Sequence, residues 1–309
     1  MTGRLMLIDS ASLYFRAYFG VKETFLAPDG TPVNAVRGFL DMIATLVTAR
    51  RPDRLVACWD DDWRPAFRVQ AIPSYKAHRL AANGANQEQS PPELDVQVPV
   101  IVELLAALGV ARVGVPGYEA DDVIGTLVTR AVADGPGEVE VVTGDRDLFQ
   151  LVDDAAGVRV LYTGKGVRNL EVVDQARLMT RYGVGTGQGY ADMAALRGDP
   201  SDGLPGVPGV GEKTAVGLVS RYGSLAALRA AAVAADPGLS AGQISKLQSA
   251  SDYLDVAPTV VQVARDAPVA EHDDTLPITP PDPDLLLATA VRWGVESSVA
   301  RVLKAFSGP

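Results

Sequence analysis

Acidic residues stand directly after several short apolar runs, and this arrangement constrains the fold more than any other feature of the sequence. Asp9 follows the run at 5–8, and Asp60 follows the run at 55–59. Asp145 ends a third run of this kind. Apolar runs of this length are typical of strands buried in a parallel sheet, and the charge then marks the end of the strand.

Strand-like runs alternate with segments of helical periodicity. We expect strands over residues 4–8, 55–59, 113–115, 139–143 and 158–162, and helices over roughly 34–49, 97–108, 119–133 and 174–182. This alternation predicts an α/β fold with a mostly parallel central sheet flanked by helices. Ligands bind beyond the carboxyl ends of the strands in such sheets, so we expect the acids that follow the strands to line a site.

Nine acids are candidates for that site. Three groups add closely spaced carboxyls to Asp9 and Asp60: Glu119-Ala-Asp121-Asp122, Asp145-Arg-Asp147 and Asp199-Pro-Ser-Asp202. Carboxylates that converge on one point repel each other strongly unless cations lie between them. Hard divalent ions such as Mg²⁺ or Mn²⁺ prefer oxygen ligands, and two of them can flank a phosphate during hydrolysis. We therefore predict a metal-dependent phosphodiesterase site, although the acids at 119–122 would also suit the first turn of an ordinary helix.

The composition sets few further limits. The 309 residues can bury a large core, and the single cysteine, Cys58, excludes an internal disulfide and suits a reducing cytosol. No stretch approaches the roughly 20 apolar residues of a membrane span, and the start of the chain does not resemble a signal peptide. The net charge of -10 would disfavour a nucleic-acid partner, but the candidate metal ligands account for most of the imbalance.

A glycine-rich segment follows the last acid pair: Gly206-Val-Pro-Gly209-Val-Gly211-Glu-Lys213-Thr214. It departs from the Walker phosphate loop because Glu212 separates Gly211 from Lys213 and no strand precedes it. Helical residues through about 197 and a second helix over about 212–221 favour a helix-hairpin-helix. Its glycines would let the backbone approach a phosphate, and its helix-start amides would grip a duplex without reading bases. A simple helix–helix turn is the alternative.

Taken together, the motifs resemble the bacterial 5′-3′ exonuclease and flap endonuclease family, which includes the 5′-nuclease domain of DNA polymerase I. The resemblance rests on Phe67-Arg68, Tyr75-Lys76-Ala-His-Arg79, Gly117-Tyr-Glu119-Ala-Asp121-Asp122, Thr143-Gly-Asp145-Arg-Asp147-Leu and the block from Gly198-Asp199 to Lys213-Thr214-Ala. It runs from about residue 4 to 305 and implies a free-standing member with a PIN-like sheet and a helix-hairpin-helix subdomain.

The resemblance also implies a division of the chain. The expected parts are a nuclease core at 1–190 that includes an arch or clamp at 63–95, a helix-hairpin-helix subdomain at 191–250, and a C-terminal segment at 251–309 with a linker at 276–284 and docking helices at about 284–293 and 296–306. The residues at 80–92 lack an apolar face, so we expect a mobile loop or a marginal helix there.

For the metal site, the resemblance assigns ligands to two or more ions, Mg²⁺ or Mn²⁺. The first ion would take Asp9, Asp60, Glu119 and Asp121, with Asp122 beside them or acting through water; Asp145 and Asp147 would lie between the ions, and Asp199 and Asp202 would complete the second.

For the substrate, the resemblance places Arg68, Lys76 and Arg79 in the arch near the scissile phosphate, where a cation offsets charge that builds in the transition state. Tyr75 and Tyr14 could stack on bases, with core packing as the alternative for Tyr14. Duplex contacts would come from Gly206, Gly209, Gly211, Lys213 and Thr214, and K⁺ could bridge the hairpin carbonyls to a phosphate. The chain departs from the family pattern at Gly203, where Asn is usual, and after Arg79, where basic and aromatic residues are few.

The function implied by the resemblance is that of a structure-specific 5′ nuclease, which hydrolyses DNA phosphodiesters by two-metal-ion catalysis in replication and repair. Its partner would be branched, nicked or gapped DNA with a 5′ end or flap. We expect a cytoplasmic, nucleoid-associated monomer without membrane contact. Two alternatives stay open: a PIN-like ribonuclease, which is usually shorter and lacks the hairpin, and a non-catalytic binder of branched DNA, which would be expected to have lost metal ligands.

Overall fold

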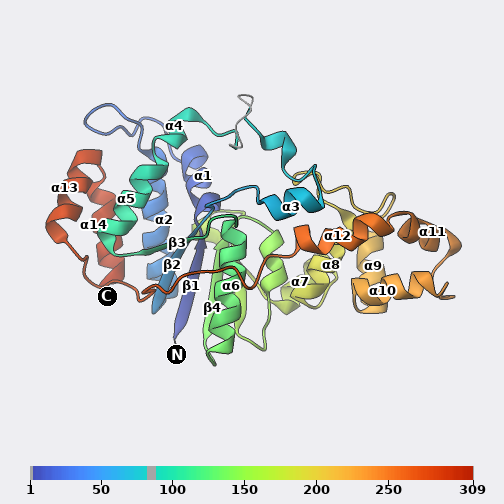
Figure 1. The fold of residues 1–309 in the computed structure, drawn as a ribbon. Helices are drawn as coiled ribbons and strands as arrows, with labels where there is room; N and C mark the ends of the chain where they lie inside the picture. The colour runs from blue at the N-terminus through green and yellow to red at the C-terminus, as the bar shows by residue number, and fades with distance from the viewer. Residues whose placement is uncertain (1–2, 82–87, 309) are drawn as a thin grey trace.

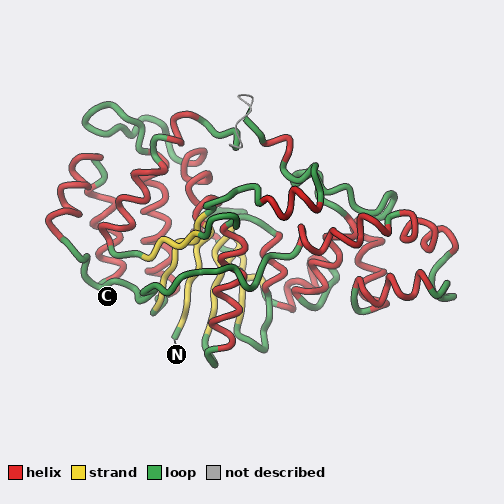
Figure 2. The backbone as a smooth tube through the Cα atoms, viewed as in Figure 1, coloured by secondary structure: helices red, strands yellow, loops and turns green. Residues whose placement is uncertain are grey.

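The computed structural model describes residues 3–81 and 88–308 and has a six-stranded sheet at its centre (Figures 1 and 2). The strands are β1 (Arg4–Asp9), β2 (Arg54–Trp59), β3 (Ala111–Gly114), β4 (Glu138–Thr143), β5 (Val158–Tyr162) and β6 (Glu171–Val173). Their order is β3-β2-β1-β4-β5-β6, and every neighbouring pair is parallel except β5 and β6. The predicted mostly parallel sheet is confirmed, and the order reverses between β1 and β4.

Helices cover both faces of the sheet, which explains why its strands are apolar on both sides. In β1, Leu5 and Leu7 point into one core while Met6 and Ile8 point into the other. One face packs against α6 (Ala120–Ala133). The other face packs against α1 (Ser10–Gly20), α2 (Asn34–Arg50) and α5 (Val98–Leu108), and α13 (Pro283–Trp293) and α14 (Glu296–Phe306) pack on the outside of α5 and α2.

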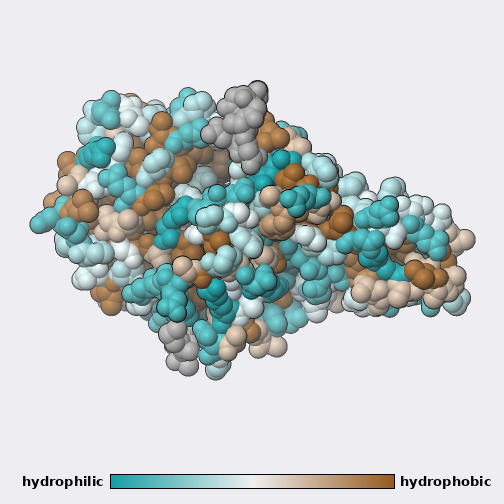
Figure 3. Space-filling model, in the orientation of Figure 1, coloured by the Kyte–Doolittle hydropathy of each residue, from teal (hydrophilic) through white to brown (hydrophobic). Residues whose placement is uncertain are grey.

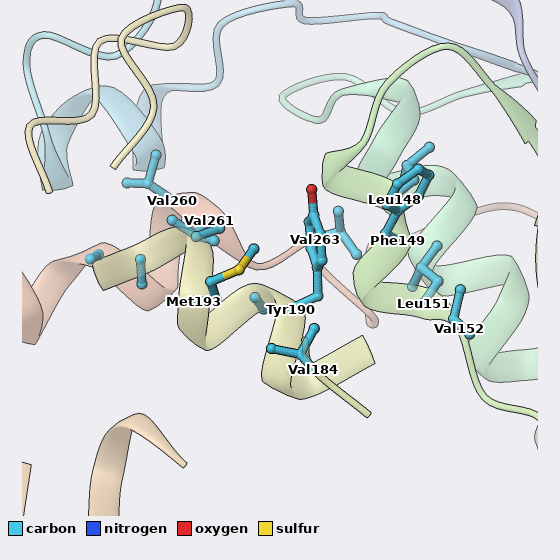
Figure 4. Packing of buried hydrophobic residues seen from close by; sticks show 14 of the residues in the cluster. Leu148, Phe149, Leu151, Val152, Val184, Tyr190, Met193, Val260, Val261 and Val263 are labelled. Carbon is cyan, nitrogen blue, oxygen red and sulfur yellow. The ribbon is translucent and has the colours of Figure 1, made fainter. Parts of the chain in front are cut away.

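A helical extension projects from one end of the sheet, to the right in Figure 1. It contains α7 (Gln175–Tyr182), α8 (Gly187–Arg197), α9 (Glu212–Tyr222), α10 (Leu225–Val233), α11 (Ala241–Ser249) and α12 (Ser251–Val261). Figure 4 shows Tyr190 and Met193 of α8 between Phe149 and Val261. Phe149 belongs to η2 (Asp147–Leu151), the short helix that follows β4. One apolar core therefore continues from the sheet into the extension.

Among the described residues between β2 and α5 there are three short helices. They are α3 (Ala66–Ala71), η1 (Ala77–Arg79) and α4 (Pro92–Asp95), and η3 (Val167–Asn169) lies between β5 and β6. The loop predicted at 80–92 includes residues 82–87, which lie outside the described residues, so that part of the prediction stays open.

The remaining predicted elements agree with the structure to within two residues at their ends, but several elements of the structure have no counterpart in the prediction, among them α1, β6, α11 and α12. The helix α1 mixes aromatic and small residues without a clear apolar stripe, and β6 is a three-residue edge strand. After α12 the chain returns along the sheet, where Leu55 N donates to Asp274 O at 2.8 Å and Leu276 N donates to Asp53 O at 2.9 Å. Helices α13 and α14 then pack against the second core.

The surface in view in Figure 3 mixes hydrophilic and hydrophobic residues. Within the described ranges, none of the helices has the length and apolar character that spanning a bilayer would require.

Candidate active site

A cavity of about 470 Å³ opens at the carboxyl ends of β1, β2 and β4, where the strand order reverses. This is the position at which open α/β sheets bind ligands. Seven of the nine predicted acids line it: Asp9, Asp60, Glu119, Asp121, Asp145, Asp147 and Asp199. We call this cavity the acid cleft. Its acids come from five separate segments of the chain, which the fold brings together.

Hydrogen bonds join the acids that follow the two central strands. Asp9 accepts from the backbone N–H of Ser12 at 3.1 Å, which caps α1, and from the hydroxyl of Thr143 at 2.6 Å. Thr143 ends the neighbouring strand β4, and its Oγ1 accepts from the backbone N–H of Asp145 at 2.8 Å. The positions of Asp9 and Asp145 are therefore linked through one threonine.

The start of α6 fixes the acids on the other side of β1. Asp60 accepts from the backbone N–H of Ala120 at 2.8 Å, which ties the end of β2 to the first turn of α6. Glu119 precedes that turn and is buried. It accepts from the hydroxyl of Tyr75 at 2.7 Å and from the ammonium of Lys76 at 2.6 Å. These contacts hold the carboxylate at the cleft wall.

The remaining acids lie at the entrance to the helical extension. Asp145 Oδ1 accepts from the backbone N–H of Asp147 at 2.9 Å. Asp199 Oδ1 accepts from the backbone N–H of Ser201 at 2.8 Å, and Asp199 Oδ2 lies 3.7 Å from the guanidinium of Arg197. The loop after β4 thus supplies Asp145 and Asp147 to the cleft, and the turn after α8 supplies Asp199.

Burial raises the free energy that is needed to ionise the acids of the cleft. It raises the pKa of Asp9 to about 6 and the pKa of Asp60 to about 7, and neighbouring carboxylates add to both shifts. Burial, followed by the charges of the other acids, also raises the pKa of Asp121 and of Asp147 well above the ordinary value. A cleft of this kind attracts cations, because a cation removes the repulsion that keeps these groups protonated.

The donor set fits hydrated divalent ions. In the part of the chain that the structure describes, no three His, Cys, Asp or Glu side chains form a group that could hold a metal ion. Mg²⁺ nevertheless keeps several waters and is usually bound through one or two carboxylates. A cavity of about 470 Å³ ringed by carboxylate oxygens has room for such waters. The acids therefore suit hard cations held partly through water rather than a closed protein cage.

Two of the three predicted basic residues stand at the cleft. Lys76 and Arg79 line it, and each is paired with a predicted metal ligand. Although burial opposes its charge, the carboxylate of Glu119 holds the pKa of Lys76 well above its ordinary value. Arg79 donates to Asp202 Oδ1 and to the carbonyl of Ser201, at 2.6 and 2.8 Å. Asp202 is 15% exposed at its side chain and does not itself line the cleft.

The third basic residue, Arg68, and the acid Asp122 lie beneath the cleft and do not line it. Arg68 is 2% exposed, and its guanidinium donates to both oxygens of Asp122 at 2.7 and 2.6 Å. The same carboxylate accepts from the backbone N–H groups of Glu119 and Ala264. Arg68 also donates to the carbonyl of Val260 at 3.1 Å and lies 3.5 Å from Glu119. Because neither side chain lines the cleft, these contacts do not support the predicted roles near the scissile phosphate and beside the first ion.

The two tyrosines that were predicted to stack on bases, Tyr75 and Tyr14, are instead packed against other side chains. Tyr75 is only 3% exposed and donates to Glu119, so it cannot stack on a base and the prediction for it is corrected. Tyr14 packs beside Trp59, with ring centroids 5.7 Å apart, and is partly buried against the second core. Its neighbour Phe15 lines the acid cleft instead. Tyr14 has the packing role that was its alternative.

Several cleft residues were missed from the sequence. Ser12, Trp63, Tyr162 and Arg197 line the cavity but belong to no charged motif. Arg197 had a signal, because it ends α8 directly before the acid pair at 199–202. The others reach the cleft through the register of their elements, for which the sequence holds no local sign.

Gly203 joins the stretch at 74–79 to the turn that carries Asp199 and Asp202. It has a φ of +74°, and a Cβ there would lie 2.1 Å from the carbonyl oxygen of Ser74. The backbone N–H of Lys76 donates to Asp202 O at 2.9 Å. The departure from the family pattern at Gly203 is thus matched by a close backbone contact that only glycine permits.

The glycine-rich segment forms the predicted hairpin between α8 and α9. Gly206 is buried under the hairpin, whereas Gly209 and Gly211 are exposed. Gly211 caps α9, and no heavy atom lies within 4 Å of the place where its Cβ would be. Lys213 and Thr214 are exposed in the first turn of α9. The arrangement leaves helix-start amides and one lysine free to face a ligand from solvent, as an anion site requires.

Two family models match the chain. The 5′-3′ exonuclease N-terminal resolvase-like domain matches residues 4–183, and the 5′-3′ exonuclease C-terminal SAM fold matches residues 186–284. The first contains the sheet and most of the acid cleft. The second begins at α8 and contains the hairpin and the last two acids.

Similar proteins cover the whole chain. A 5′-3′ exonuclease of Streptomyces coelicolor is 58% identical over 301 residues, which are 96% of this chain and 98% of that protein. A 5′-3′ exonuclease of Mycobacterium tuberculosis is 51% identical over 315 residues, 99% of this chain and 98% of that protein. The bacteriophage T5 D15 flap endonuclease, solved with DNA and metal ions, has a TM-score of 0.65 at 16% identity and covers 97% of this chain and 100% of that one. This structural likeness shows the fold.

Proposed function

The chain belongs to the 5′-3′ exonuclease family, and we propose that its acid cleft hydrolyses DNA phosphodiesters at a 5′ end or flap. The chain is therefore a nuclease. The observation that carries the proposal is the meeting of seven acids from five segments at the switch point of the sheet, with two basic side chains on the same wall. Such a combination suits a phosphate held between cations.

Divalent ions, Mg²⁺ or Mn²⁺, are the proposed cofactors. Asp9, Asp60, Glu119 and Asp121 would hold one of them, and Asp145, Asp147, Asp199 and Asp202 would serve the second. When bound, the ions would supply a nucleophilic water and offset the negative charge that develops on the phosphate and the leaving oxygen. Asp122 would act only by holding Arg68 and the start of α6 in place.

Lys76 and Arg79 are the proposed phosphate contacts of the cleft. In the structure each neutralises an acid, Glu119 and Asp202 respectively. Ions bound to those acids would compete with the two cations, which could then turn to the phosphate on the same wall. Arg79 suits this role because its planar guanidinium can donate two hydrogen bonds to a phosphate, whereas Lys76 acts as a point charge.

The hairpin at 206–211 is the proposed duplex grip. The exposed N–H groups at the start of α9, together with Lys213 and Thr214, would contact the phosphate backbone without reading sequence. We propose the division into a nuclease core at 1–190, a hairpin subdomain at 191–250 and a C-terminal segment at 251–309. K⁺ at the hairpin carbonyls is an alternative proposal, which a dependence of DNA affinity on K⁺ would support. We place the activity on chromosomal DNA in the cytoplasm and assign it to a monomer.

The test compares substrates that share one sequence: a 5′-flapped, a nicked and a gapped DNA duplex, and the same flap made of RNA. We expect cleavage of the DNA substrates with Mg²⁺ or Mn²⁺, products with a 5′-phosphate and a 3′-hydroxyl, and no cleavage in EDTA. Preferential cleavage of the RNA flap would support the ribonuclease alternative. Binding without turnover in Mn²⁺ would support the non-catalytic one.

A further inference from the structure

One lysine of the extension reaches the hairpin from a distant helix. Lys246 lies in α11 and is exposed, and its ammonium donates to the carbonyl of Gly209 at 2.9 Å across 37 residues of sequence. Gly209 has a φ of +71°, and a Cβ at this position would come within 2.7 Å of Lys246 Nζ. The glycine therefore opens the space that the ammonium occupies at the exposed turn of the hairpin.

We propose that Lys246 is a DNA-positioning residue that places a tethered cation in the hairpin, where K⁺ was expected. The inference rests on the proposed role of the hairpin as a duplex grip. Lys246 would contact the same stretch of phosphate backbone as Lys213. The grip would then be built from two helices, α9 and α11, rather than from the hairpin motif alone.

The electrostatics of the hairpin favour a cation at this point. An exposed carbonyl oxygen carries partial negative charge and would repel a phosphate that approached the neighbouring amides. An ammonium bound to that carbonyl reverses the sign of the local charge. It has three donors, so the bond to Gly209 leaves two for a phosphate oxygen or for water. No carboxylate of the described chain lies within 4.0 Å of the Lys246 ammonium to neutralise it.

The surrounding surface continues the positive charge. A neighbouring hollow of about 330 Å³ is lined by Lys213, Arg221 and Gln243, among others. Gln243 lies on α11 three residues before Lys246, so both point toward the side of the extension that carries α9. Lys213 and Arg221 of α9 and Lys246 of α11 thus place cations on both helices, which suits a contact with a DNA backbone.

The experiment measures DNA binding by fluorescence anisotropy with a 5′-flapped duplex, with EDTA present to prevent cleavage. Lys246→Met, which keeps the length of the stem, is compared with wild type and with Lys304→Met, the same change on the exposed face of α14. Affinities are measured from about 50 to 200 mM salt, over which one phosphate contact changes affinity about 3.5-fold. Wild type is also measured in KCl and in tetramethylammonium chloride, whose cation is too large to bind between carbonyl and phosphate.

We expect Lys246→Met to bind roughly eightfold more weakly at about 0.1 M salt and to have a salt slope smaller by about one. Lys304→Met and the exchange of K⁺ for tetramethylammonium should leave affinity unchanged. Wild-type affinity and slope in Lys246→Met, or a wild type that itself requires K⁺, would overturn the inference. Lys213→Ala separates the two failures: if it also binds normally, the duplex-binding role of the hairpin fails, and if it weakens binding while Lys246→Met does not, only the inference fails.

Discussion

The acid cleft and the glycine hairpin are proposed to bind the same ligand, a phosphate backbone, with different chemical groups. The cleft uses buried carboxylates from five segments that approach one another only after the sheet has formed. The hairpin uses exposed backbone and two lysines, most of it within one stretch of sequence. The comparison separates two requirements. Catalysis requires like charges to be held close together at a high cost in free energy. Duplex binding requires only a local backbone conformation and an accessible positive charge.

This contrast implies that variants of the two regions should fail in different ways. A substitution in the cleft should lower the cleavage rate with little change in DNA affinity. A substitution in the hairpin should lower DNA affinity with little change in the cleavage rate. A variant that crosses this division would show that the two regions work as one unit.

The largest effect is expected from Asp147→Asn, which keeps the shape of the side chain and removes its charge. Because the residue lies among other acids that need cations, we expect cleavage of a 5′-flapped duplex to fall by at least about 10³-fold. Binding of the same duplex should change by less than about twofold, since removing a negative charge does not weaken a phosphate contact. The measurements are single-turnover cleavage and anisotropy.

The matched control is Asp284→Asn, the same change at an exposed residue of α13. It should cleave as wild type does. A cleavage rate within tenfold of wild type in Asp147→Asn would remove this acid from the reaction and weaken the contrast between the two regions.

The second-largest effect is expected on stability, from the buried ion pair beneath the cleft. The buried pair of Arg68 and Asp122 has side chains that are 3% and 0% exposed. Arg68→Met leaves the Asp122 carboxylate buried and without its cation, so we expect a loss of about 3–5 kcal/mol in the free energy of unfolding. Arg301→Met breaks an exposed pair with Asp41, and it should cost less than about 1 kcal/mol. Chemical denaturation followed by circular dichroism tests both, and equal losses would mean that burial of the first pair has no special cost.

The sheet could be predicted from the sequence because its information is local. Apolar runs define the strands, and in a parallel sheet the residues that follow Ile8, Trp59 and Thr143 must reach one edge. The sequence therefore predicts Asp9, Asp60 and Asp145 at that edge, where the structure has them. The hairpin was recognisable for a similar reason, since its glycines and helix starts are contiguous.

The contacts made by each charge could not be predicted in this way. Asp121 and Asp122 are neighbours in sequence, yet Asp121 lines the cleft, whereas Asp122 points into the core and accepts hydrogen bonds from Arg68. That choice depends on how α6 is rotated against the segment at 66–71, which no local pattern encodes. Lys246 was missed for the same reason, because the turn it contacts lies 37 residues away.

A smaller effect, also in the cleft, should follow from pH. The folded pKa values of Asp9 and Asp60, about 6 and about 7, lie above the ordinary value of 3.8. Between these limits the unfolded chain releases protons that the folded chain keeps, so the metal-free protein should lose stability as pH rises from about 4 to about 7. Each group contributes on the order of 1 kcal/mol per pH unit at most.

Thermal unfolding in EDTA over this pH range measures the trend, and Asp60→Asn should flatten it between about pH 5 and 7, because the amide cannot titrate. A melting temperature that rises with pH in wild type would contradict the assigned burial of these acids. The hairpin variants Lys213→Ala and Lys246→Met supply the comparison, since neither removes a group that titrates in this range, and both should follow the wild-type curve.

The smallest effect is expected in the hairpin, from Lys213→Ala. The side chain is exposed in the first turn of α9, so its loss should leave the fold intact and remove one phosphate contact. We expect the slope of log affinity against log salt to fall by about one and the single-turnover rate at saturating DNA to stay within about twofold of wild type. Lys304→Ala, the same change on α14, should alter neither quantity. A lower rate at saturation with an unchanged slope would make Lys213 part of the chemistry, and the division between a cleft that reacts and a hairpin that holds would then no longer describe this molecule.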